Sequence, residues 1–324
     1  MSFSYKNEKN RIIERLKEKN LPLDQCEIVA DVMATADMYG VTSHGVRILD
    51  SHIQRLERGA YNVNPQFKHI KETSAFALVD GDNALGFVSA DYCMNYAVEK
   101  CKESGIFHVI SKNNNTFGPA FYYPLQAAKS GMIGFVCCNS PAQMAPIGGK
   151  DKLLGTNPFA AVIPVPNSEP IIIDMATSVV AKSKFKEYKE QNKKLPEGWA
   201  LDKEGNSTID PDAAMQGLVQ PMAGFKGYAI SMLIDILSGV ISGASYLDKV
   251  GRFYSEDKNS MNVGFYFTAI NPKLIIGEEY DEIITDFVNK IRESETIGNA
   301  KICLPGDDRI SYMRDVTINE SASN

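Results

Sequence analysis

Strand-length apolar runs alternate with segments of helical spacing between about residues 75 and 180, and this alternation is what most constrains the fold. The runs that resemble buried strands cover residues 75–80, 106–111, 132–139, 159–165 and 171–174. Residues 89–104 and 122–130 lie between them and have apolar side chains three or four positions apart, as amphipathic helices do. The order predicts an α/β fold in which helices cover the faces of a sheet.

Helical spacing dominates the first sixty residues, where helices are expected over 11–19, from Asp24 to about Gly40, and over 47–56. Further along, 224–243 reads as a long apolar helix, 263–270 as a strand and 280–292 as an amphipathic helix. The charged stretch 182–194 favours a solvated helix face over a binding patch.

The composition excludes several classes of function. Lys and Arg number 34 against 40 Asp and Glu, a net charge of −6, which argues against binding to nucleic acid or to an anionic membrane. Apolar residues make up 44% and charged residues 23%, as in ordinary globular proteins. There is no apolar run long enough to span a membrane and no signal-peptide pattern at the N-terminus. Six cysteines without a Cys-x-x-Cys pair predict reduced thiols, a cytoplasmic location and no metal site.

No common catalytic or nucleotide-binding motif names the reaction. The Gly-x-Gly-x-x-Gly dinucleotide fingerprint, the Walker-type phosphate loop, His-Glu-x-x-His and Gly-x-Ser-x-Gly do not occur in the sequence. Small and polar residues nevertheless gather in three places without an obvious packing reason.

The first place is the segment Gly40-Val41-Thr42-Ser43-His44-Gly45-Val46-Arg47. His44 can transfer a proton near neutral pH, and Ser43 can fix its tautomer or hold a substrate oxygen. Arg47 lies about one helical turn further on and could bind a carboxylate in a bidentate manner. The alternative is that Ser43 caps a helix and that His44 is an ordinary surface residue.

The second place is Asn113-Asn114-Asn115-Thr116-Phe117-Gly118-Pro119, which predicts either a polar pocket lined by amides or a simple Asn-rich turn. The third place is a set of small-residue loops beside the predicted strands, at 139–141, 146–149, 155–158 and 174–178. Backbone amides in such loops bind phosphate and ribose groups, and Lys226 could add a positive charge at a helix start. The alternative is a set of ordinary strand-end turns.

These segments closely resemble the malate/L-lactate dehydrogenase family of type 2. That family includes ureidoglycolate dehydrogenase, 2,3-diketogulonate reductase, sulfolactate dehydrogenase and the reductases of cyclic imines. The resemblance runs from about Tyr39 to Arg309. It is carried by residues 40–46, 144–149, 154–158, 174–178, 196–202, 224–228 and 304–307.

The resemblance implies a nicotinamide-dependent oxidoreductase with a mixed-sheet, non-Rossmann α/β fold. It implies a cofactor-binding domain over 71–294, a mostly helical substrate-side domain built from 1–70 and 295–324, and a homodimer. By analogy, the cofactor would contact Ser140, Asp174, Met175, Ala176, Thr177, Ser178, Lys226, Gly227, Pro305, Gly306 and Asp307. His44 matches the proton donor of the diketogulonate reductase branch.

Two departures from the family pattern affect the expected chemistry. Family members commonly carry a histidine, the base of ureidoglycolate dehydrogenase, where this chain has Thr116, and a hydroxyl cannot act as a base near neutral pH. The acid–base role is therefore expected of His44. The usual arginine lies four residues after this histidine, whereas here Arg47 lies three after it and Ile48 takes the usual position. On a helix this shift is a rotation of about 100°.

The sequence thus predicts an enzyme that uses NADH or NADPH, with NAD favoured, to reduce a small 2-oxo acid to a 2-hydroxy acid. His44 and Ser43 are the expected catalytic residues, and Thr116 and Arg47 are expected to bind the substrate. One alternative is a reductase of a cyclic imino acid or 2-imino acid. The other is a paralogue that binds the nucleotide without turning over a substrate.

Overall fold

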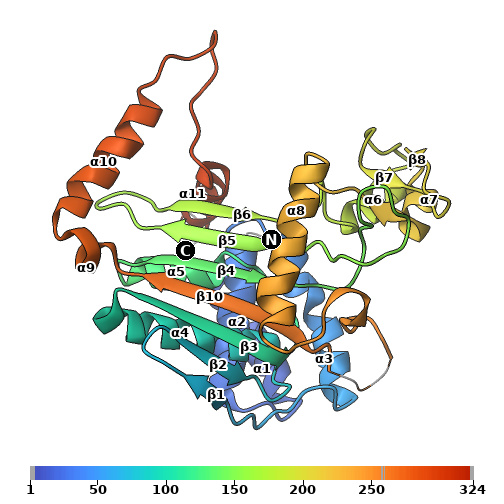
Figure 1. The fold of residues 1–324 in the computed structure, drawn as a ribbon, viewed down its shortest axis with the longest axis horizontal. Coiled ribbons are helices and arrows are strands. Elements are labelled where there is room, and N and C mark those ends of the chain that lie inside the picture. Colours follow the sequence, from blue (N-terminus) through green and yellow to red (C-terminus); the bar gives the residue numbers. More distant parts are fainter. Residues whose placement is uncertain (1–3, 257, 259, 322–324) are drawn as a thin grey trace.

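A seven-stranded mixed sheet forms the centre of the protein, seen in a computed structural model that describes residues 4–256, 258 and 260–321 (Figure 1). The strand order is β1-β2-β3-β10-β4-β5-β6. The strands are β1 (Lys68–Glu72), β2 (Phe76–Asp80), β3 (Ile106–Asn114), β4 (Ile133–Cys138), β5 (Phe159–Ile163), β6 (Ile171–Met175) and β10 (Val263–Ile270). Only β2 and β3 pair in parallel, so the expected α/β fold with a mixed sheet is confirmed.

Helices cover one face of this sheet in successive layers. The helices α4 (Gly86–Ser104) and α5 (Tyr122–Lys129) pack on β3, β10 and β4. Behind them lie α2 (Leu23–Met38) and then α1 (Tyr5–Lys17), with α3 (Leu49–Glu57) after a pair of short 3₁₀ turns. Buried side chains of α1 and α2 belong to the same apolar cluster as those of the sheet, so the N-terminal helices and the sheet share one core.

The opposite face of the sheet is crossed by α8 (Phe225–Asp235), which continues into a π-helical turn over Ile236–Val240. Together they form one continuous helical stretch over 225–240, which agrees with the long helix expected over 224–243 except that its last turn is π-helical. Ser238 lies in the turn, and its carbonyl occupies the space that a Cβ at Gly264 of β10 would need. The glycine therefore lets the helix approach the sheet closely.

A smaller lobe, formed by the chain between β6 and α8, lies beside the sheet (Figure 1). It contains α6 (Ser183–Glu190), α7 (Pro211–Gln216) and a three-stranded sheet of order β8-β7-β9. Its strands are β7 (Ala200–Leu201), β8 (Ser207–Thr208) and β9 (Leu218–Val219). Phe185, Leu195 and Met144 belong to its own apolar cluster, separate from the main core. The sequence did not predict this small sheet, because strands of two residues show no periodicity.

The N-terminal and C-terminal helices contact each other on the helical side of the molecule. After α9 (Pro272–Ile276) and α10 (Glu279–Arg292), the chain forms α11 (Asp307–Ser321), which contacts α2. The ring of Tyr312 on α11 lies against Gly40, just before the segment that carries His44. The predicted domain boundary between residues 70 and 71 falls inside β1.

Candidate active site

His44 sits in a tight 3₁₀ turn, Thr42–His44, that is held against the end of α2. The Asp37 carboxylate on α2 accepts a hydrogen bond of 2.8 Å from the backbone N–H of Val46. A Cβ at Gly45 would overlap this carboxylate, so only glycine allows the turn to approach α2 this closely. The turn is therefore positioned by the protein core and not by its own short helix.

The imidazole of His44 is half-buried and paired with its neighbour. Ser43 Oγ lies 2.9 Å from His44 Nδ1, which leaves Nε2 without a hydrogen bond to any described residue. Burial lowers the pKa of His44 below its usual 6.5, a shift opposed by the negative charge of Asp174 and reinforced by the positive charge of Arg309. In the absence of a ligand, this histidine is accordingly neutral at pH 7, with one ring nitrogen available for proton transfer.

His44 lines a cleft of about 860 Å³ between the main sheet and the smaller lobe. Ser43, Ile48, Thr116, Phe253 and Met261 contribute from the main body. Pro141, Ala142, Gln143, Lys152, Lys182, Met215 and Gln216 contribute from the smaller lobe and the segments that lead to it. Arg252, Tyr254 and Ser255, in the loop before β10, complete the lining. The structure thus brings together three of the predicted catalytic or substrate-binding residues, Ser43, His44 and Thr116.

The Asn-rich segment is a structural turn, and of its polar residues only Thr116 lines the cleft. Asn114 and Asn115 are fully buried. The Asn115 amide donates to Asn83 Oδ1 and to the carbonyl of Ala84, both at 2.9 Å, and Asn114 donates to the carbonyl of Val263 at 3.2 Å. These bonds tie the loop after β3 to neighbouring loops, which makes the Asn-rich turn the correct alternative for the two amides.

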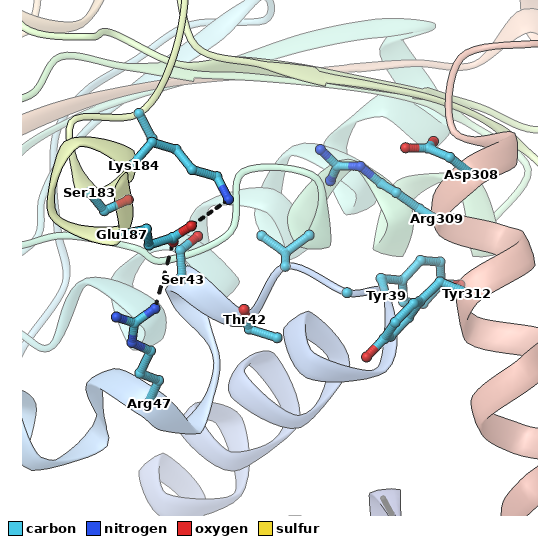
Figure 2. Close-up of a pocket in the computed structure, with 13 residues that line it drawn as sticks. Tyr39, Thr42, Ser43, Arg47, Ser183, Lys184, Glu187, Asp308, Arg309 and Tyr312 are labelled. Atoms are coloured by element: carbon cyan, nitrogen blue, oxygen red, sulfur yellow. Dashed lines mark hydrogen bonds and ion pairs between the residues drawn. The ribbon is translucent and has the colours of Figure 1, made fainter. Parts of the chain in front are cut away.

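Arg47 lies outside the cleft, in a neighbouring cavity of about 410 Å³ (Figure 2). Its Nη1 lies 3.9 Å from Glu187 Oε1 on α6, and Lys184 pairs with the same carboxylate at 2.7 Å. Ile48 lines the cleft instead. The physical cause is the second 3₁₀ turn, Val46–Ile48, in which adjacent residues face different directions.

Three of the candidate cofactor residues, Ser140, Thr177 and Gly227, belong to one hydrogen-bonded cluster near the end of β6. Ser140 N donates to Asn157 Oδ1 at 3.0 Å, and Asn157 Nδ2 donates to the carbonyl of Ser231 on α8 at 2.9 Å. Thr177 N donates to the carbonyl of Thr156 at 2.9 Å, while the Thr177 carbonyl accepts from the N–H of Met222, also at 2.9 Å. The segments around Ser140, 174–178 and 226–227 are therefore adjacent.

The side chains in this cluster differ in what they offer. Thr177 and Ser178 are buried and bond to the carbonyls of Thr156 and Val180, whereas Met175 and Lys226 are exposed. Asp174 and Ala176 are both half-buried, and the Asp174 carboxylate forms an ion pair with Arg309 of α11. The N-terminus of α8 has no side-chain cap, and a Cβ at Gly227 would overlap the carbonyls of Met222 and Thr177. The N–H groups of Lys226 and Gly227 bond to the carbonyls of Ala223 and Met222, so an anion at this helix start would be met chiefly by the exposed Lys226 side chain and the positive end of the helix dipole.

The segment Pro305-Gly306-Asp307 joins the other side of β6. The Pro305 carbonyl accepts a hydrogen bond of 3.0 Å from Ile172 N, and Gly306 has φ +94 where a side chain would meet Ile172. The Asp307 carboxylate is already paired with Arg292 at 2.8 Å and accepts from Leu304 N at 2.9 Å. A ligand at Asp307 would therefore have to share this carboxylate with Arg292.

Sequence reasoning missed Lys152, Lys182 and Arg252, the three cations of the cleft. They come from the loop after β4, the residue before α6 and the loop before β10. No local pattern connects positions so far apart, so only the tertiary structure could bring them together.

Comparison with known proteins agrees with this geometry. The profile of the malate/L-lactate dehydrogenase family matches residues 3–318. A malate dehydrogenase of Pyrococcus horikoshii is 38% identical over 292 residues, 87% of this chain and 80% of that protein. An L-sulfolactate dehydrogenase of Methanocaldococcus jannaschii is 38% identical over 302 residues, 93% of this chain and 87% of that protein. The solved sulfolactate dehydrogenase of the same organism superposes with a TM-score of 0.91 at 37% identity, covering 97% of this chain and 91% of that chain.

Fold, cleft and similarity together define the class of protein, an oxidoreductase of the dehydrogenase type built on a mixed sheet. More particularly, the chain belongs to the malate/L-lactate dehydrogenase family. Within the described residues, no helix is both long and apolar enough to cross a membrane, and no group of three metal-ligating side chains occurs. Five of the six cysteines are buried free thiols, and Cys303 is an exposed one.

Proposed function

We propose that this protein interconverts a small 2-oxo acid and the corresponding 2-hydroxy acid with a nicotinamide nucleotide, and that His44 donates the proton during reduction. The observation that carries the proposal is the placement of His44. Its Nδ1 is held by Ser43, its Nε2 is free of described partners, and the ring lines a cleft also lined by Thr116.

The chemistry requires one hydride and one proton. A bound nicotinamide nucleotide would supply the hydride, and this chain's own residues would have to deliver a proton to the carbonyl oxygen as negative charge develops on it. His44 as imidazolium would supply this proton, and in the reverse direction neutral His44 would accept it. Ser43 would hold the ring orientation, and the Thr116 hydroxyl would orient the carbonyl through a hydrogen bond. General acid catalysis of this kind contributes on the order of 10²–10⁴-fold in rate.

The cluster at the end of β6 supports binding of NAD or NADP. The uncapped start of α8 and the side chain of Lys226 would face the phosphates, and the 174–178 loop, with Ser140 and Pro305–Asp307, would contact the remainder of the nucleotide. The names of the relatives include both NAD- and NADP-dependent dehydrogenases, so they support a nicotinamide nucleotide without choosing between the two. We favour NAD.

His44→Ala, assayed with a panel of 2-oxo acids and both reduced nucleotides, tests the proposal. We expect kcat to fall about 10²–10⁴-fold while nucleotide binding stays unchanged. His69→Ala is the matched control, because His69 lies on β1 and bonds to Glu72 and Tyr92. Turnover of His44→Ala close to wild type would remove His44 from the mechanism.

Thr116 keeps an imino-acid substrate open as a second function. Where the family commonly has a histidine, this cleft offers only a hydroxyl, so the carbonyl chemistry lacks that second acid–base group. Repeating the panel with methylamine or ammonium tests this reading, since an imine reductase would show turnover that depends on the amine. A paralogue without turnover would bind the nucleotide, shown by thermal shift, and remain inactive throughout.

We further propose a homodimer that pairs through α8 and its π-helical turn. Six large apolar side chains are exposed there: Phe225, Met232, Leu233, Ile236, Val240 and Ile241. Several are three, four or seven residues apart and so lie on one side of the helix. Ile236→Glu is expected to give a monomer by light scattering, whereas Ile70→Glu, at an equally exposed site on the edge strand β1, should leave the mass unchanged. A dimeric Ile236→Glu would exclude this face.

A further inference from the structure

Arg55, in the last turn of α3, is buried behind one wall of the cleft that contains His44 and is only 2% exposed. Its Nη1 donates a hydrogen bond of 3.0 Å to the backbone carbonyl of Phe253, which lines the cleft from the loop before β10. Its Nη2 donates to Asn115 Oδ1 at 3.4 Å, and Asn115 directly precedes Thr116, another lining residue. One guanidinium therefore connects two parts of the cleft wall that lie far apart in the chain.

A third part of the wall is bonded to the same acceptor. Asn115 Oδ1 also accepts a hydrogen bond of 3.3 Å from the backbone N–H of Met261, which lines the cleft just before β10. The Asn115 amide nitrogen donates to Asn83 Oδ1 and to the Ala84 carbonyl, so the direction of its oxygen is fixed. Because a guanidinium presents its N–H groups in a rigid plane, Arg55 can bond to both acceptors only while these segments keep their spacing.

Aromatic rings pack around this guanidinium. Arg55 Cζ lies 5.3 Å from the centre of the Tyr61 ring and 5.6 Å from the centre of the Phe253 ring. His52, one turn earlier on α3, packs against Phe253 with ring centroids 4.8 Å apart, and its Nδ1 lies 3.1 Å from the Tyr61 hydroxyl. Phe253 is therefore held on α3 by its ring as well as by its backbone carbonyl.

The helix that carries Arg55 is also the helix that follows the His44 turn. Ile48, directly before α3, lines the cleft together with His44. The chain itself thus fixes the distance from the proton donor to α3, and Arg55 fixes the distance from α3 to the rest of the wall. An apolar side chain could fill this space without the cost of desolvating a cation. The contacts of Arg55 therefore argue for a role in geometry beyond filling the core.

We infer that Arg55 is a positioning residue for the reaction in this cleft. It holds Phe253, Met261 and the segment of Thr116 at a fixed distance from His44, so that the substrate carbonyl meets the imidazole in one orientation. The inference rests on the proposed 2-oxo acid reduction. Arg55 does not itself line the cleft and takes no part in proton transfer. Its effect on the rate comes from orientation, to which such reactions are sensitive.

Arg55→Lys tests the inference, since lysine keeps the charge but cannot bond to both acceptors in one plane. We expect kcat/KM for the 2-oxo acid to fall about 10–100-fold, the worth of one hydrogen bond to a charged group. The KM for the nucleotide should stay close to the wild-type value, because the segments expected to bind it, 174–178, 226–227 and 305–307, do not line this cleft.

Leu16→Ala is the control for lost stability. Leu16 is fully buried in α1 and lies outside the cleft, so its truncation should lower the free energy of unfolding and leave kcat/KM at the wild-type value. If Arg55→Lys is as active as wild type, or if the two variants lose activity by the same factor, the inference is overturned.

Amide hydrogen exchange separates this inference from the proposed function, because it needs no turnover. The N–H of Met261 is bonded to Asn115, and the N–H of Gly251 is bonded to the Met261 carbonyl at 2.9 Å. In Arg55→Lys both amides should exchange about 10-fold faster or more, while exchange within α4 stays unchanged, as local opening requires. An equal acceleration within α4 would mean that Arg55 only stabilises the fold, and unchanged exchange at Met261 would mean that it does not hold the wall.

If the wild-type protein reduces no 2-oxo acid, the proposed function fails, and the exchange at Met261 still decides whether Arg55 holds the wall. Phe253→Leu replaces Arg55→Lys should that variant not fold. It removes the ring that packs on His52 and Arg55 but keeps the backbone carbonyl that Arg55 binds. We expect faster exchange at Met261 with α4 unchanged, and the absence of this local effect would overturn the inference.

Discussion

Replacing Lys182 with methionine should stabilise the ligand-free protein. The pKa of Lys182 falls from the ordinary 10.5 to about 8, chiefly through burial and then through Lys152 and Arg252. Each factor of ten in a protonation constant corresponds to about 1.4 kcal/mol. The full shift corresponds to about 3 kcal/mol, which we reduce to about 1.5–2 kcal/mol because the side chain retains contact with solvent.

The sign follows from proton binding. Between pH 8 and 10.5 the unfolded chain holds a proton on Lys182 that the folded protein has released. The folded state therefore carries the full penalty below pH 8, and the penalty disappears as the pH approaches 10.5. Methionine keeps much of the aliphatic contact and removes the charge.

Thermal unfolding without ligand measures the effect. An unfolding entropy of about 2.1 cal/mol/K per residue gives about 0.7 kcal/mol/K for 324 residues. The expected gain in Tm is then about 2–3 °C at pH 7, and it should largely vanish at pH 10. Wild type and variant are compared in the same chloride buffer at one protein concentration, because ligand binding or a shift in assembly would change Tm by itself. A variant less stable than wild type at pH 7, or a gain that is equal at both pH values, would refute the reasoning. Lys186→Met, at an exposed lysine of α6 outside the cleft, should change Tm by less than about 1 °C.

Three further predictions concern the neighbourhood of the cleft. Burial lowers the pKa of His52 to about 3, so folding requires the neutral imidazole. Acidification below pH 6.5 should therefore lower the free energy of unfolding, by about 2 kcal/mol at pH 5. Denaturant titration of His52→Gln should show a smaller loss between pH 7 and pH 5, and an identical loss would exclude His52 as its source. Gly45→Ala forces the turn away from Asp37, so kcat/KM should fall at least 10-fold. The free energy of unfolding in urea should also fall, by about 1–3 kcal/mol. Full activity of the variant would contradict the predicted overlap. Burial lowers the pKa of His44, so kcat/KM for reduction should already be declining with rising pH below pH 6.5, and the rate profile of His44→Gln should lack this limb.

The folded elements that bury a face along several turns or residues could be predicted from the sequence. The helix expected over 89–104 is α4, Gly86–Ser104, and the strands expected over 106–111 and 263–270 are β3 and β10. Each places apolar residues at the period of its own backbone, so a local pattern suffices. The amphipathic helix α10 was found for the same reason. Strands as short as β7 and β8 present one residue to each face and carry no such pattern.

The candidate site likewise contains residues that the sequence could predict and residues that it could not. Ser43 and His44 are adjacent in the chain, so their pairing was visible as a dipeptide, and the small residues at strand ends pointed to the cluster around Thr177. The direction of Arg47 depended on a 3₁₀ turn whose geometry is imposed by Asp37 of α2. One residue of difference in spacing sent its guanidinium into the neighbouring cavity.

The sequence by itself determined the α/β class, the helix and strand periods and the presence of a histidine suited to proton transfer, because these depend on residues within a few positions of one another. Only the tertiary structure decided which charges share the cleft with that histidine. Lys152 and Arg252 are separated by 100 positions in the chain, and their repulsion becomes significant only when folding removes the water between them.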